Sequence, residues 1–205
     1  SADYIRRCCS SLRELRTSAE PLEVIIKTRL LINEKFNTIL IFLLSNLIYS
    51  QDKIKYKKLE FNDFLGKVPD SPNEYSKFAA VSMISIESKI VKNSVWSGKI
   101  KIEIYSMFSK NESWIRENQK TKELLNHEQR HFDIAKIYSN KLQKIINKRI
   151  NNIKDYNENF QNLYDEIYVE YFDYQTKYEE ITDRGLNFEN QKLIDKEIDE
   201  KLNEK

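Results

Sequence analysis

The sequence contains few of the residues that build phosphate-binding loops and disulfide frameworks. Its 205 residues include only three glycines, and its two cysteines are adjacent, at Cys8 and Cys9. So few glycines exclude a Gly-rich phosphate loop, and neighbouring cysteines lack the spacing of a zinc knuckle. We therefore assign the cysteines no role. If the chain is cleaved near Ser50, as considered below, the remaining domain has no cysteine for a disulfide.

An excess of charge of one sign is also missing. The chain has 34 Lys and Arg against 32 Asp and Glu, a formal net charge of +2, and the basic residues alternate with acidic ones. Such mixing is typical of solvated helix faces, and it predicts no nucleic-acid partner. With 40% hydrophobic and 32% charged residues, the chain is long enough for one domain with a substantial core.

Histidine is equally scarce, and both histidines fall in one motif. His127 and His131 belong to the HExxH pattern His-Glu-Gln-Arg-His, in a run with helical spacing of apolar residues. Residues four apart share a helix face, so both imidazoles can bind one zinc ion, and Glu128 stands beside its bound water. The sequence thus predicts a zinc hydrolase with ligands His127 and His131 and catalytic residue Glu128. The alternative is two core histidines satisfied by hydrogen bonds.

One long apolar run precedes the motif. Basic residues at 27, 29 and 35 lead into Phe36–Tyr49, which the small residue Ser50 follows. The run is shorter than the roughly 20 residues of a membrane span, so residues 25–50 are predicted to be a signal-peptide-like segment cleaved near Ser50. An uncleaved membrane anchor or a buried helical hairpin are the alternatives. We interpret residues 1–24 as an upstream extension of unclear role and 51–205 as the working domain, secreted or in the periplasm or cell envelope.

Two strands are predicted before the motif. Apolar residues lie mostly at alternate positions from Ala79 to Lys92, and Lys99–Tyr105 alternates cleanly after a turn that ends at Gly98. This pattern predicts an antiparallel hairpin whose apolar face packs on the histidine helix. One of its strands is a candidate for pairing with a substrate backbone, the alternative being an ordinary half-buried sheet.

Three helices are predicted from the motif onward, which makes the chain an α+β protein. The motif helix is expected over 119–153, the second over 158–178, and the last after a break at Asp183-Arg184-Gly185. The second helix carries an aromatic stripe that is predicted to be core, with one tyrosine as a candidate oxyanion donor. The stripe comprises Phe160, Tyr164, Tyr168 and Phe172, with Ile167, Tyr171, Tyr174 and Tyr178 beside them.

Three segments resemble a bacterial family of predicted secreted zinc-dependent proteases that carries a domain-of-unknown-function label. They are Leu59–Lys67, Lys110–Trp114 and Leu124–Ile134, the last with the core His-Glu-Gln-x-His-Phe-Asp-Ile. The resemblance covers about 59–202. It implies a zincin-like fold, export, zinc binding by His127 and His131, and a catalytic role for Glu128.

The chain departs from this family at the third ligand. The family tends to have Thr-x-His-Gly where this sequence has Thr182 to Gly185, with Arg184 in place of the histidine. The third ligand is then a carboxylate, a tyrosine or no protein group. We favour Asp183, because a turn at Gly185 can direct it back toward the motif. The other candidates are Glu180, Glu179, Glu166, Glu170 and Asp173.

The function predicted from these features is hydrolysis of peptide bonds in a protein or peptide substrate. A zinc-activated water would attack the carbonyl while Glu128 takes its proton. Arg184 favours an alternative, an exported non-catalytic binding or scaffold module that keeps the zincin fold. A zinc hydrolase with a non-protein substrate is a further alternative.

Overall fold

The computed structural model describes residues 52–69, 78–94 and 98–204, which lie in one compact unit, Asp52–Lys205. The predictions for residues 1–24 and 25–50, including cleavage near Ser50, lie outside the described residues. Among the described residues, none of the helices combines the length and the apolar character that crossing a membrane requires.

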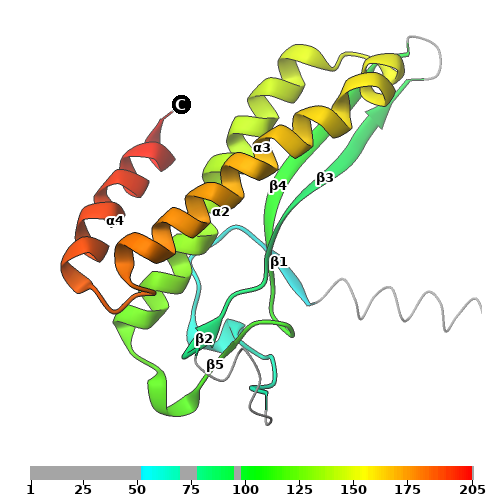
Figure 1. The fold of residues 1–205 in the computed structure, drawn as a ribbon. Helices are drawn as coiled ribbons and strands as arrows, with labels where there is room; N and C mark the ends of the chain where they lie inside the picture. Colours follow the sequence, from blue (N-terminus) through cyan, green and yellow to red (C-terminus); the bar gives the residue numbers. More distant parts are fainter. Residues whose placement is uncertain (1–51, 70–77, 95–97, 205) are drawn as a thin grey trace, which may run out of the picture. The chain divides into compact units, whose positions relative to one another are not determined.

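A three-stranded antiparallel sheet precedes the helices, with β4 at its centre (Figure 1). Its order is β1 (Lys53–Lys55), β4 (Ile100–Ser109) and β3 (Ile84–Asn93). The β3–β4 ladder runs from Ile84 opposite Phe108 to Asn93 opposite Ile100, so the predicted hairpin is confirmed. The first predicted strand is interrupted at Ser82 and Met83, because its first residues belong to another sheet. That small sheet pairs β2 (Ala80–Val81) with β5 (Trp114–Ile115).

The three predicted helices are present, with different ends. They are α2 (Lys122–Arg149), α3 (Ile153–Thr182) and α4 (Phe188–Asn203), with short 3-10 turns at Phe61–Asp63 (η1) and Glu117–Gln119 (η3). Each α-helix starts at a residue whose side chain accepts a hydrogen bond from the first turn, an N-cap. The chain is therefore α+β, with a small antiparallel sheet and three helices.

The core forms around α2, which packs on β4 and β3 and also contacts α3 and α4 (Figure 1). Ile102, Ile104 and Phe108 alternate along β4 and are buried, as expected for a strand with one face on a helix. Phe132 of α2 is fully buried and tilts against Phe108. Replacing such a ring with Ala typically costs about 3–5 kcal/mol, so these contacts hold the motif helix rigidly on the sheet.

The predicted aromatic core stripe on α3 is only partly correct. Phe160 is buried, but Tyr168 is 45% and Phe172 61% exposed. Steps of four advance about 40° further than one helical turn, so a stripe at this spacing winds away from the core. The residues predicted beside this line are mostly buried, namely Ile167, Tyr171 and Tyr178, and the buried face of α3 also includes Leu163 and Thr182.

Candidate metal centre

The two motif histidines meet a carboxylate from the next helix. His127 and His131 lie on one face of α2, with their Nε2 atoms 3.3 Å apart. Glu179 of α3 places Oε1 3.0 Å from His131 Nε2 and Oε2 3.8 Å from His127 Nε2. One ligand atom from each of the three residues lies within 4.8 Å of the other two, a group able to hold a metal ion. The two predicted histidine ligands thus lie beside a carboxylate of α3.

Each histidine is held from behind by a glutamine. His131 Nδ1 lies 2.6 Å from Oε1 of Gln175, and His127 Nδ1 lies 3.0 Å from Oε1 of Gln191. An amide oxygen only accepts, so each glutamine favours a proton on the Nδ1 that it faces and leaves Nε2 as the ring atom directed toward the other histidine. Tyr178 stacks on His127 at 4.9 Å and donates to its backbone oxygen. Metal-binding histidines are typically oriented by such partners.

The carboxylates of Glu179 and Glu128 beside the imidazole of His131 favour positive charge at this point. Burial opposes the charged form of His131, but Glu179 and Glu128 outweigh it and raise the pKa of this imidazole. Burial also opposes the ionised form of Glu179, but His127 and His131 outweigh it and hold the pKa of this carboxyl well below its usual range. Oε2 of Glu179 is buried without a hydrogen-bond partner. A buried charged oxygen without a donor is costly, and a divalent cation would satisfy it together with both nitrogens.

Glu128 lies next to this group but is held separately from it. It is 5% exposed, and Ser82 in the β2–β3 connection donates a hydrogen bond of 2.5 Å to its Oε2. With His131 and Glu179 it lines a cleft of about 430 Å³ between the β2–β3 segment and α3. Glu128 is thus placed to act on a molecule in the cleft rather than to complete the ligand set.

The walls of the cleft are mainly apolar. Tyr171 is buried, and burial raises its pKa to about 12, while Tyr168 and Phe172 expose their rings at the rim. Across the cleft lie Val81 and Met83. No Lys or Arg lines it among the described residues. The cleft thus suits an extended ligand with a large uncharged side chain.

The structure brings together the predicted residues His127, His131 and Glu128, and it selects Glu179 among the candidate third ligands. Asp183, the favoured candidate, is instead the exposed left-handed cap of α3, with φ 47°. Gly185 does turn the chain, but it brings its own backbone close to the imidazole of His127, since a Cβ added to it would lie 3.0 Å from His127 Cγ. The other carboxylates are absent from the group.

Arg184 also has a different environment from a metal ligand. Its guanidinium lies over the ring of Phe78, 5.7 Å from the centroid. A group of three candidate ligands forms without a histidine at this position, because Glu179 of α3 brings a carboxylate to His127 and His131.

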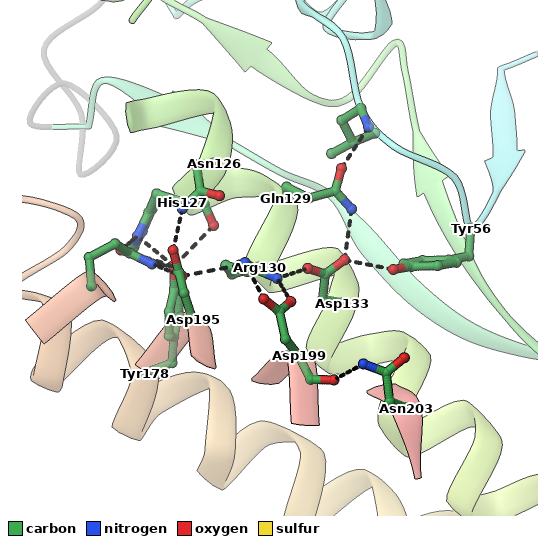
Figure 2. A network of polar contacts seen from close by, with 12 residues as sticks. Tyr56, Asn126, His127, Gln129, Arg130, Asp133, Tyr178, Asp195, Asp199 and Asn203 are labelled. Atoms are coloured by element: carbon green, nitrogen blue, oxygen red, sulfur yellow. Dashed lines mark hydrogen bonds and ion pairs between the residues drawn. The ribbon is translucent and has the colours of Figure 1, made fainter. Parts of the chain in front are cut away.

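Three residues that organise the site were not predicted, namely Ser82, Gln175 and Gln191. Tyr178 was predicted only as one of the aromatic residues of the second helix, without a choice among its tyrosines. Spacing was a usable signal for Gln175, which lies one turn before Glu179 on α3. Asp133, two residues after His131 on α2, is outside the group and accepts hydrogen bonds from Tyr56 and Gln129 (Figure 2).

Comparisons of the chain with models of known protein families, with curated proteins and with solved structures give no match.

Proposed function

We propose that this protein is a zinc-dependent peptidase with a zincin-like site. His127, His131 and Glu179 would hold the metal through two imidazole nitrogens and one carboxylate. The observation that carries the proposal is the convergence of these three groups, whose ligand atoms lie within 4.8 Å of one another beside a buried carboxylate oxygen without a hydrogen-bond partner. Two histidines and one carboxylate are a known catalytic zinc set, whereas structural zinc sites usually have four protein ligands.

The chemistry follows from the residues around this point. Bound zinc would polarise a substrate carbonyl and lower the pKa of a coordinated water toward about 7. Glu128 would take a proton from the attacking water and pass it to the leaving amine. Its hydrogen bond from Ser82 fixes the carboxylate at the cleft wall, and a fixed general base needs no reorganisation during the reaction.

The wall formed by β3 supports a peptide as the substrate. Met83 accepts a backbone hydrogen bond from Ser109 of β4, while the oxygen of Ile86 points the other way and accepts from Tyr164. Alternation along the strand therefore directs the backbone N–H and C=O of Ile84 to the outer edge beside the cleft. An extended peptide can add to such an edge, with alternate side chains entering the apolar cleft.

The proposed family and location rest on the sequence. The resemblance to predicted secreted zinc-dependent proteases and the signal-peptide-like segment at 25–50 favour an exported protein that acts outside the cytoplasm. If the protein binds zinc without hydrolysing peptides, the scaffold alternative becomes the better interpretation.

The first test is the metal content of the full-length chain, measured by elemental mass spectrometry after purification without chelators. We expect about one zinc per chain, lost in His131→Ala and Glu179→Ala. Glu180→Ala is the matched control, because Glu180 is exposed, neighbours Glu179 on α3 and lies outside the group. No zinc in the wild-type protein, or equal loss in Glu179→Ala and Glu180→Ala, would contradict the proposed site.

The second test separates binding from turnover. Glu128→Gln should keep zinc but lose hydrolysis of a mixed peptide library by about 100-fold or more, as expected when a general base is removed. Glu123→Gln, an exposed carboxylate on the same helix, is the control. Zinc without peptide cleavage in the wild-type protein would reject the peptidase and leave the scaffold or another hydrolase.

A further inference from the structure

The last helix contributes no residue to the candidate ligand group, yet its Gln191 contacts His127 and its Asp195 contacts Gln191. Gln191 is 6% exposed and lies one turn before Asp195, to which its Nε2 donates a hydrogen bond of 2.7 Å. The other end of the same amide, Oε1, lies 3.0 Å from His127 Nδ1. The three groups therefore form one chain of hydrogen bonds from α4 to α2.

Asp195 determines which way the amide of Gln191 faces. A carboxylate offers only acceptors, so the amide must turn its NH2 group toward Asp195 and its oxygen toward His127. The opposite orientation would set two oxygens against each other at the distance of a hydrogen bond. The hydroxyl of Tyr178 lies 2.9 Å from His127 Nδ1 and fits the same arrangement. Its own proton goes to the backbone oxygen of His127, so its lone pairs accept from Gln191 Nε2 and from Nδ1.

Asp195 is itself held by α2. Arg130 donates from Nε to Oδ1 at 3.1 Å, and Asn126 donates from Nδ2 to Oδ2 at 2.8 Å. Figure 2 shows Arg130 between Asp195 and Asp133, with Asp199 on the same guanidinium. Arg130 is mostly buried, with 14% of its side chain exposed, so it anchors Asp195 in one place.

We infer that Gln191 and Asp195 are positioning residues that keep the proton of His127 on Nδ1 and so leave Nε2 free for a metal. An oxygen that only accepts, next to Nδ1, stabilises this tautomer and fixes the plane of the ring. At His131 the corresponding amide belongs to Gln175 of α3. It donates to the backbone oxygen of His131 at 2.9 Å and so turns its Oε1 toward Nδ1 of the same residue. The last helix thus acts on one of the two histidines alone.

This inference rests on the proposed metal site for its purpose, but its first test needs no metal. Long-range 1H–15N NMR of the metal-free full-length chain, at a pH where both rings are neutral, reports the tautomer of each ring. The chain has only two histidines, so the spectrum is simple. We expect Nδ1–H on His127 in the wild-type protein. In Gln191→Leu, His127 should become a mixture of tautomers while the signals of His131 stay unchanged, and Gln175→Leu should change the signals of His131 and leave His127 as in the wild-type protein.

The second test is zinc affinity, measured by competition with a chromophoric chelator. Gln191→Leu and Asp195→Ala should each weaken zinc binding about 10- to 100-fold, the range for loss of an outer partner of a ligand. Asp199→Ala is the matched control, because it also removes a carboxylate of α4 from Arg130 but does not contact Gln191. Circular dichroism and thermal unfolding identify any variant that fails to fold.

The outcomes are distinguishable. If the wild-type protein binds no zinc but shows the predicted tautomers, the proposed function fails and the inference about His127 stands. Nε2–H on His127 in the wild-type protein would overturn the inference. Equal weakening of zinc binding by Asp195→Ala and Asp199→Ala would also overturn it, because the effect would then come from the Arg130 ion pairs in general.

Discussion

Gly185 offers the sharpest test of how tightly the site is packed. It has φ +81°, and a Cβ added to it would lie 3.0 Å from Cγ and 3.1 Å from Nδ1 of His127. Gly185→Ala therefore has two costs: about 1–2 kcal/mol for a left-handed alanine, and about 1–3 kcal/mol for pushing into the imidazole. Because the displaced ring is a proposed ligand, zinc affinity should also fall, by about 10-fold or more.

A second glycine isolates the contact from the backbone strain. Gly98 has φ +63°, but no heavy atom of the described residues would lie within 4 Å of its added Cβ. Gly98→Ala should thus show the backbone cost alone, with unchanged zinc affinity. The assay is the free energy of unfolding from urea titration of both metal-free variants, followed by chelator competition. Equal losses of stability and equal zinc affinities in the two variants would refute the claim that the chain at Gly185 constrains the His127 ring.

Three further predictions concern separate parts of the molecule. Phe172→Ala should raise KM about 10-fold for peptides with a large apolar residue near the cleaved bond. It should leave stability nearly unchanged, because the ring is 61% exposed at the cleft rim. Steady-state kinetics checks this, with Val169→Ala as the control, because Val169 is on the same helix but outside the cleft lining. Ser82→Ala should lower kcat while keeping zinc, because it frees the carboxylate of Glu128; a change in zinc content instead would contradict the assignment of Ser82 to Glu128 alone. Asp63 is buried, which by itself would raise its pKa, but Lys57, the backbone of Glu60 and Lys110 outweigh burial and lower it. The ionised Asp63 therefore stabilises the folded protein above the unfolded pKa near 3.8, and this contribution is lost as pH falls through the lower pKa of the folded state. In Asp63→Asn, the free energy of unfolding from urea titrations should fall less steeply on the acid side than in the wild-type protein.

The parts of the fold that follow from short-range patterns were predictable. Alternation at Ile102 and Ile104 identified the central strand, and the spacing of His127 and His131 identified both the helix and its inward face. These patterns depend only on the periods of a strand and a helix, so no knowledge of tertiary contacts is needed.

The parts that depend on how the helices pack against one another were less predictable. The aromatic stripe at steps of four is predicted to be core, yet Phe172 lies exposed at the rim of the cleft. Likewise, no local pattern marks Gln191, because its role arises only when α4 packs behind His127. Both residues take their function from packing between helices, which sequence periodicity does not describe.

Glu179, the proposed third ligand, could have been predicted from the ends of α2 and α3 alone. His131 lies 18 residues before the end of α2 at Arg149, and Tyr171 lies 18 residues after the start of α3 at Ile153. Two helices that run back along each other after a short link place such residues opposite one another, because both rise 1.5 Å per residue. Side chains lean toward the start of their helix, so residues one and two turns beyond Tyr171 reach back to the histidines.

Those residues are Gln175 and Glu179, which both contact His131. The sequence predicted that the motif helix ends at residue 153 and that the second helix begins at residue 158. Counting residues from these predicted ends places the exposed Glu180, instead of Tyr171, opposite His131. Errors of four and five residues at the two helix ends thus shift the facing position by nine residues, more than two turns. The pairing of helices would have identified the ligand, had the ends been known, because Glu179 shares the face of Tyr171 and Gln175 whereas Asp183 lies beyond the last turn of α3.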